Sequence, residues 1–189
     1  MKNSLIEKDI KKAYRQLILS QKKYKSVLRK RKPLIVYNYT FKTTEDSVTL
    51  LELFKDRSEL IVIHNMGKAC PYCTLLADGL NGMIHHFEDR TAFVIISKDD
   101  PFTQQQFKES RNWKFQMVSA QNSNFTKDLG FEGKDGTPIP GVSILKKDAV
   151  GTIARMTYDT FGPGDLYCSL WHFFDLLPKR KTWSPKFSY

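Results

Sequence analysis

Residues 60–73 read LIVIHNMGKACPYC, and this stretch decides the fold that the sequence predicts. The aliphatic run Leu60–Ile63 is typical of a buried β-strand. After Cys73, the residues up to Phe87 have the apolar spacing of a helix. Two cysteines separated by two residues, between a strand and a helix, are typical of sites that exchange thiols and disulfides. The sequence therefore points first to redox chemistry at Cys70 and Cys73.

The regions on either side of this stretch alternate between strand-like and helix-like patterns. We expect strands at 34–41, 60–64, 92–97, 114–118, 142–146 and 152–158. We expect a short turn or helix at 48–54 and helices at 71–87, 102–111, 122–129 and 164–177. The last two strands are joined closely through residues 148–151, which indicates a hairpin. This order predicts an α/β fold with a mixed central sheet that helices flank.

Residues 1–32 form a separate basic segment. They hold 12 of the 30 Lys and Arg residues and two of the 20 acidic residues, so they carry the whole net charge of +10. Ser4 and Glu7 form a capping box that predicts the start of a helix. Pro33 predicts that the helix ends before it. We therefore expect a basic amphipathic helix at 1–32 and a folded domain at 33–189.

One face of this helix carries residues at alternating spacings of four and three, which is a heptad seam. The members of the seam are Ile6, Ile10, Ala13, Leu17, Ser20, Tyr24 and Val27. Such a seam packs on the body of the protein or on a second copy of the helix, and of these a homodimer through the N-terminal helix is the preferred expectation. Clustered Lys and Arg also bind phosphate or an anionic membrane surface. No aromatic platform or groove-reading motif accompanies them, so we expect no specific nucleic-acid partner.

The sequence predicts no transmembrane segment. Its longest strictly aliphatic run, Leu60–Ile63, has four residues, whereas a membrane span needs about 20 apolar residues. The basic N-terminus lacks the apolar region of a signal peptide. Three unevenly spaced cysteines do not make the disulfide framework of a secreted protein. A cytoplasmic location is therefore expected.

Cys70 is the predicted attacking thiol. It comes just before the helix, where unpaired N–H groups and the helix dipole favour an anion, and Lys68 adds a positive charge. The thiolate is the attacking species in disulfide exchange, so these features favour Cys70. Cys73 lies one helical turn further on and is the predicted buried resolving thiol. Cys168, in the last predicted helix, is expected to be a small buried hydrophobe.

A metal site at the cysteine pair is disfavoured. A structural zinc needs four ligands, and the downstream candidates His85 and His86 lie about 20 Å away along a continuous helix. We expect neither a metal nor a cofactor there, while an inert structural pair stays open. His64, at the end of the strand, is a candidate catalytic base for Cys73 because imidazole titrates near neutral pH. A hydrogen-bonded core histidine is the equal alternative.

Residues 137–141, TPIPG, directly precede a predicted strand and resemble the cis-proline loop of thioredoxin-fold proteins. In that fold the loop faces the Cys-x-x-Cys pair and offers backbone groups to the substrate. The resemblance implies that Pro140 is cis and that Ile139 and Pro140 bind the substrate. Tyr72, exposed beside the disulfide, is expected to contact the substrate as well. The alternative is an ordinary trans turn, since only about 5–6% of X–Pro bonds in folded proteins are cis.

Several blocks of the sequence together resemble the bacterial thioredoxin-like family catalogued as domain of unknown function 899. These blocks are Arg29–Pro33, Leu50–Phe54, Leu60–Met66, Cys70–Cys73, Ala77–Gly79, Trp113–Phe115, Pro140–Ser143 and Asp175–Pro178. The resemblance implies a thioredoxin-like fold over 33–189 and a redox pair without an established substrate. Two residues depart from the family pattern. Tyr72 stands where a small residue is usual, as in the Cys-Pro-Tyr-Cys of glutaredoxin, and Pro163 replaces a common basic residue.

These observations favour a thiol–disulfide oxidoreductase that acts on a disulfide-containing protein or a small-molecule disulfide. A thiol peroxidase is one alternative. It needs a Thr or Ser and an Arg close to the sulfur, for which the sequence offers Thr74 with Arg111 or Arg155. A non-enzymatic interaction module that uses the basic helix is the other alternative.

Overall fold

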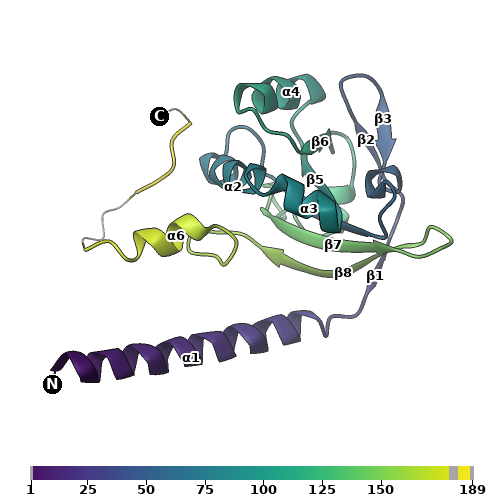
Figure 1. Ribbon diagram of the computed structural model, residues 1–189. Helices are drawn as coiled ribbons and strands as arrows, with labels where there is room; N and C mark the ends of the chain where they lie inside the picture. The colour runs from purple at the N-terminus through teal and green to yellow at the C-terminus, as the bar shows by residue number, and fades with distance from the viewer. Residues whose placement is uncertain (1, 179–182, 188–189) are drawn as a thin grey trace. The chain divides into compact units, whose positions relative to one another are not determined.

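The computed structural model describes residues 2–178 and 183–187, and it contains two compact units. The first unit is Met1–Pro33 and the second is Leu34–Tyr189. Figure 1 shows the long helix of the first unit and the sheet and helices of the second. In the described part of the chain, no helix is both long and apolar enough to cross a membrane.

The first unit is a single helix, α1 (Lys2–Leu28). It already includes Ser4, so the expected capping box of Ser4 and Glu7 does not begin it. No glycine or proline precedes Ser4, and the helix continues to Lys2 without a break. The heptad seam is exposed in the single chain: the exposed fractions of Ile6, Ile10, Leu17 and Val27 are 56%, 55%, 52% and 55%.

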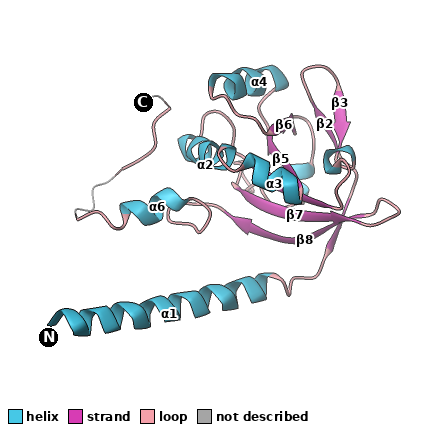
Figure 2. Cartoon of the chain, in the orientation of Figure 1, coloured by secondary structure: helices cyan, strands magenta, loops and turns pink. Residues whose placement is uncertain are grey.

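The second unit is built on an 8-stranded sheet with the order β1-β8-β7-β4-β5-β6-β2-β3 (Figure 2). The strands are β1 (Leu34–Val36), β2 (Thr40–Lys42), β3 (Ser47–Thr49), β4 (Glu59–His64), β5 (Ala92–Ser97), β6 (Gln116–Ser119), β7 (Gly141–Lys147) and β8 (Ile153–Thr160). Strand β4 is parallel to β5 and antiparallel to β7, while β7 and β8 form the expected hairpin. The sheet is therefore mixed, as the sequence predicted.

The strand expected at 34–41 is instead two short strands that pair at different places. β1 pairs with β8, and β2 pairs with β6 and β3. A flat sheet would place β1 and β2 about 29 Å apart at normal strand spacing. The linker from Val36 to Thr40 reaches only about 15 Å. The sheet must therefore curl so that its two sides approach each other at this linker.

Most helices of the second unit are shorter than the sequence pattern suggested, whereas α4 has the expected length and is shifted by one residue. They are η1 (Glu52–Phe54), α2 (Pro71–Asn81), α3 (Ile84–Arg90), α4 (Pro101–Ser110), α5 (Phe125–Asp128) and α6 (Ser169–Phe174). The helix expected at 71–87 breaks between α2 and α3, where Gly82 caps α2. Glycine lowers helix stability, which accounts for the break. His85 and His86 therefore lie on α3, not on the helix that begins at the cysteines.

The side chains of β4 point alternately into two hydrophobic cores, one on each face of the sheet. Leu60 and Val62 belong to a core with Phe125 and Phe131, whereas Ile63 packs with Leu76 and other residues of α2 and α3. Side chains of successive strand residues point to opposite faces. This arrangement fixes α2 against one face of the sheet and leaves its first residues at the end of β4.

Candidate active site

Cys70 is the N-cap residue of α2. Its backbone is extended, with φ −98° and ψ 104°, and Pro71 occupies the first turn. The Sγ atom of Cys70 accepts a hydrogen bond from the backbone N–H of Cys73 at 3.2 Å. A side chain that accepts from the third residue of a helix satisfies one of the N–H groups that the helix leaves unpaired. The fold thus holds the Cys70 sulfur at the positive end of the helix dipole.

The two thiols of the pair have unequal environments. The hydrogen bond from the Cys73 thiol and those from the backbone N–H groups of Cys73 and Tyr72 lower the pKa of Cys70 to about 6, against the opposing effect of burial. The bond to Cys70, burial and the Cys70 charge raise the pKa of Cys73. Cys70 is half-buried and Cys73 is buried, and both are free thiols. At neutral pH the reduced pair therefore consists of an accessible thiolate and a protonated thiol.

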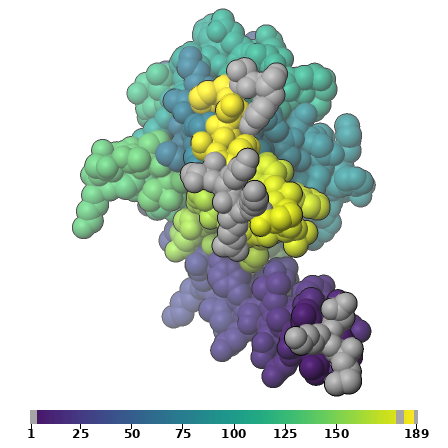
Figure 3. Space-filling view, turned by 90° about the vertical axis from the view of Figure 1, so that its left-hand side faces the viewer, coloured from purple at the N-terminus to yellow at the C-terminus, as the bar shows by residue number. Residues whose placement is uncertain are grey.

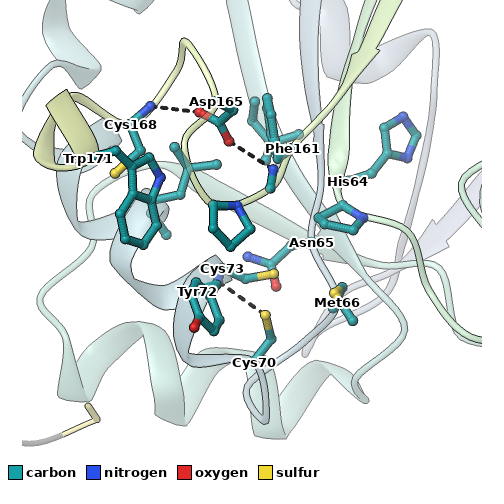
Figure 4. Close-up of a pocket in the computed structure, with 16 residues that line it drawn as sticks. His64, Asn65, Met66, Cys70, Tyr72, Cys73, Phe161, Asp165, Cys168 and Trp171 are labelled. Atoms are coloured by element: carbon teal, nitrogen blue, oxygen red, sulfur yellow. Dashed lines mark hydrogen bonds between the residues drawn. The ribbon is translucent and has the colours of Figure 1, made fainter. Parts of the chain in front are cut away.

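Three chain segments surround a cavity of about 350 Å³ beside this pair (Figure 4). The first runs from the end of β4 into α2 and carries both cysteines and Tyr72, the second is Pro140, and the third lies between Phe161 and Trp171. Figure 3 shows the C-terminal residues, in yellow, gathered on one face of the second unit. The rings of Tyr72 and Trp171 lie with their centroids 6.0 Å apart. Residues about 100 positions apart in the sequence therefore share one site.

Pro140 lines the cavity, but its peptide bond is not cis. Within the described residues every peptide bond is trans, which corrects the expectation for Pro140. Trans is the ordinary state of an X–Pro bond, and the Pro140 carbonyl accepts a hydrogen bond from Phe161 at 2.9 Å. Ile139 does not line the cavity: its N–H bonds to the Phe131 carbonyl at 2.9 Å, and its side chain packs against the core that contains Phe131.

His64 lies at the end of β4, with its ring turned away from both sulfur atoms (Figure 4). Its Nε2 atom shares a hydrogen bond of 2.9 Å with the Ser143 hydroxyl, and its ring stacks on Phe131 with centroids 3.6 Å apart. Burial, with the charge of Arg155 as a lesser cause, lowers the pKa of His64 to about 3. Strand alternation explains the orientation, because Ile63 faces α2 and the next side chain faces the opposite core. His64 lines the same cavity as the two cysteines, but the hydrogen bond of its imidazole goes to Ser143 and not to Cys73.

The third wall of the cavity, formed by the segment after β8, is not expected from the sequence. The carboxylate of Asp165 accepts hydrogen bonds from the backbone N–H groups of Gly162, Tyr167 and Cys168, at 3.0, 2.7 and 3.0 Å. These bonds fold the segment after β8 into a compact turn. Cys168 comes before α6 instead of inside it, and it is half-buried and lines the cavity instead of being fully buried. Burial raises the pKa of this thiol.

Of the residues expected for a peroxidase, Thr74 contacts Cys70, but neither arginine lies in the cavity beside the cysteines. The Thr74 hydroxyl donates to the Cys70 carbonyl at 3.1 Å. Arg111 donates to both carboxylate oxygens of Asp78, and one of them also accepts from the Trp113 indole N–H at 2.8 Å. Arg155 lies over the Tyr158 ring at 4.3 Å. Neither arginine lines the cavity. Through its contact with Asp78, Arg111 instead joins α2 to the segment after α4.

No cluster of ligands marks a metal centre in the part of the chain that the structure describes. There, groups of three or more His, Cys, Asp or Glu side chains close enough to share an ion are absent. Apolar and aromatic side chains line the cavity beside the cysteine pair, including Leu76, Phe161 and Trp171.

Comparison with known proteins gives one family and one fold. The family model described as "Bacterial protein of unknown function (DUF899)" matches residues 9–186. The chain is similar in structure to peroxidoxin BcpB from Mycobacterium tuberculosis, with 18% identity over 69% of this chain and 85% of that chain and a TM-score of 0.56. It is also similar to reduced Prx3 in complex with H2O2 from Vibrio vulnificus, with 19% identity, 70% and 88% coverage and a TM-score of 0.54.

A third similar structure is the mitochondrial 2-Cys peroxiredoxin from Plasmodium falciparum, with 16% identity, 75% and 90% coverage and a TM-score of 0.53. No curated protein matches the chain. Identities this low establish the fold alone. Peroxiredoxins have a thioredoxin-like fold, so the thioredoxin-like fold predicted from the sequence is confirmed.

Proposed function

Since the chain belongs to the DUF899 family of bacterial proteins, whose function is unknown, we propose from its own residues that it is a thiol–disulfide oxidoreductase. Cys70 is the attacking thiolate and Cys73 the resolving thiol. The observation that carries this proposal is the unequal pair: the pKa of Cys70 is lowered to about 6, while the pKa of Cys73 is raised. Disulfide exchange needs one thiolate that attacks at ambient pH and a second thiol that stays protonated until the mixed disulfide has formed.

The reaction proceeds in two exchanges. The Cys70 thiolate attacks one sulfur of the substrate disulfide, the substrate S–S bond breaks, and the first substrate thiolate leaves. A mixed disulfide then joins Cys70 to the second half of the substrate. Cys73 loses its proton and attacks the Cys70 sulfur, which releases the second substrate thiolate. The substrate gains two electrons, the pair becomes a disulfide, and an external dithiol returns it to the reduced state.

Local geometry supports the separate roles of the two cysteines. Cys73 lies one turn after Cys70 on α2, and its N–H already bonds to the Cys70 sulfur at 3.2 Å. Cys73 is 6% exposed, so a bulky substrate reaches Cys70 first. Once a mixed disulfide forms, the thiolate charge on Cys70 that helped raise the pKa of Cys73 disappears. Cys73 then becomes easier to ionise at the moment when it must attack.

A cytoplasmic location fits the proposed reaction, because a cysteine pair that acts as a reductant works in a reducing compartment.

Insulin reduction with a dithiol recycling agent tests the proposal. We expect the wild type to be active and Cys70→Ser to lose activity by at least about a hundredfold, since the attacking sulfur is absent. Without the recycling dithiol, reduced Cys73→Ser should accumulate a mixed disulfide that mass spectrometry detects as a substrate adduct on Cys70. Wild-type activity in Cys70→Ser would overturn the assignment.

A thiol peroxidase is the second candidate, and the likeness to peroxiredoxin structures is the observation that favours it. In that reaction the Cys70 thiolate attacks a peroxide oxygen, becomes a sulfenic acid and condenses with Cys73 to a disulfide and water. The cavity lining offers no arginine to stabilise the leaving oxygen in the described residues. Stopped-flow oxidation by H2O2 separates the candidates. A rate no better than that of free cysteine excludes the peroxidase.

A further inference from the structure

We propose that the cavity beside Cys70 selects disulfides that carry an apolar, uncharged group, and that it discriminates against anionic disulfides such as oxidised glutathione. This inference rests on the proposed oxidoreductase function and names the substrate class of the same site. Its basis is the chemistry of the cavity walls.

The walls are apolar on the side of the sheet and on the side of α6. Ile63 and Leu76 come from β4 and α2, and Phe161 and Trp171 come from the segment after β8. The cavity volume of about 350 Å³ lies in the range of sites that bury a small ligand or a large side chain. Removing apolar surface from water is favourable in proportion to its area. An apolar group next to the attacked disulfide therefore gains binding energy here.

The charges on the cavity walls also favour an uncharged substrate over an anionic one. Among the described residues that line the cavity there is no Lys or Arg, and the charged members are the Cys70 thiolate and Asp165. Its carboxylate already accepts three backbone hydrogen bonds and adds a negative charge to the wall. A carboxylate on the substrate would lose water without gaining a cation, which is unfavourable. Glutathione carries such carboxylates, so this wall disfavours it.

The third wall is held in place before any substrate arrives. Asp165 fixes the turn at Gly162 and Cys168, and the Phe161 N–H donates to the Pro140 carbonyl at 2.9 Å. The Phe161 ring also contacts the Tyr167 ring, with centroids 5.0 Å apart. A wall fixed in this way keeps its shape on binding, so its apolar character is a selective feature.

Tyr72 marks the side of the cavity from which a substrate enters. Its ring is 39% exposed and lies 6.0 Å from the Trp171 ring, one residue away from the helix start at Pro71. Figure 4 shows both rings around the space next to the Cys70 and Cys73 sulfurs. Aromatic faces contact aliphatic and aromatic groups favourably. The group attached to the attacked sulfur therefore meets two aromatic side chains.

The test compares two aromatic disulfides that differ in charge, 2,2′-dithiodipyridine and the dianionic 5,5′-dithiobis(2-nitrobenzoate), together with oxidised glutathione. Each kcat/KM is divided by the rate constant of the same disulfide with free dithiothreitol, so that intrinsic reactivity cancels. Added salt screens the distant charges of the basic helix. We expect the normalised value for the neutral disulfide to exceed both anionic values by at least about tenfold. Equal values, or a preference for the anionic disulfides, would overturn the proposal.

A pair of matched variants tests the charge argument directly. Pro163→Arg adds a cation to the cavity wall, and Val150→Arg adds one at the exposed β7–β8 turn, away from the cavity. We expect Pro163→Arg to narrow the preference at least about threefold and Val150→Arg to leave it unchanged. An equal response of both variants would contradict the proposal. If turnover instead persists in Cys70→Ser, the oxidoreductase assignment itself fails. Cys70-dependent turnover without discrimination contradicts the substrate class alone.

Discussion

The backbone N–H of Cys73 donates to the Cys70 sulfur at 3.2 Å, so the proposed resolving residue also stabilises the proposed attacking thiolate. The hydrogen bond between the two thiols lowers the pKa of Cys70 and raises the pKa of Cys73, which explains why the two cysteines differ although they lie on one helical turn. The thiol hydrogen bond from Cys73 is the largest cause of the lowered pKa of Cys70. Removing that thiol should therefore change the acidity of its partner.

Alkylation measures this acidity. In a Cys168→Ser background, the rate at which iodoacetamide modifies Cys70 should rise with pH through a midpoint near 6 and then level off, because only the thiolate reacts. In Cys73→Ala the midpoint should move upward by at least about one pH unit, towards the ordinary thiol pKa. Mass spectrometry of the modified peptide gives both rates. A midpoint that is the same in both proteins would show that Cys73 does not stabilise the thiolate.

His64 should contribute to stability instead of to proton transfer. Its folded pKa of about 3 is below the ordinary value of 6.5, so the unfolded chain binds a proton first as the pH falls. The stability from the neutral ring is present above about pH 6.5 and is lost as the pH falls towards 3. His64→Phe should lower the free energy of unfolding at pH 7 by about 1–3 kcal/mol, because the Ser143 hydroxyl loses its partner.

Urea unfolding at neutral and acid pH checks this prediction. The difference between wild type and His64→Phe should shrink as the pH is lowered, since only the wild type carries the acid-labile ring. The alkylation midpoint of Cys70 should stay the same in both proteins. A slower resolution step by Cys73 in His64→Phe, with unchanged stability, would instead support the catalytic-base role suggested by the sequence.

Local signals predicted the part of the site that is contiguous in sequence. Pro71 identifies the start of α2, and hence places Cys70 just before the helix, because proline fits the first turn. The far wall could not be predicted in this way, because Trp171 reaches Tyr72 only through tertiary packing. The orientation of His64 depends on which face of β4 meets α2, and the residue type alone does not reveal that face.

The same limit applies to the sheet. The apolar pattern from Leu34 to Phe41 indicates extended chain correctly, but it carries no information on pairing partners. In the structure, β1 and β2 pair with β8 and β6, strands more than 70 residues away. Pairing of distant strands depends on the whole fold and not on local propensity.

Gly141 should be intolerant of a side chain. A Cβ atom there would lie 2.4 Å from the Asp159 carbonyl oxygen and 2.4 Å from the Phe131 ring. Gly141→Ala should therefore destabilise the protein by about 1–3 kcal/mol, since neither neighbour can move freely. Because Gly141 follows Pro140 and pairs with His64 in β4, the displacement should also reduce disulfide reduction.

Gly79→Ala is the matched control for this substitution. Gly79 lies inside α2, and a Cβ atom there would meet nothing within 4 Å. Alanine favours the helix, so this variant should be more stable by about 0.5–1 kcal/mol. Thermal unfolding of both variants under reducing conditions measures the two effects. Equal shifts would show that close packing at Gly141 is not the cause.

The seam of α1 predicts a homodimer. Leu17 belongs to the heptad seam, whereas Leu19 lies about 200° away around the helix. Both side chains are exposed within the single chain, at 52% and 64%, so they differ in position and not in burial. Leu17→Glu should place a carboxylate in the apolar contact between two helices and separate the dimer, while Leu19→Glu should leave it intact. Light scattering coupled to size exclusion gives the mass of each protein. A monomeric wild type, or the same mass change in both variants, would contradict pairing through this seam.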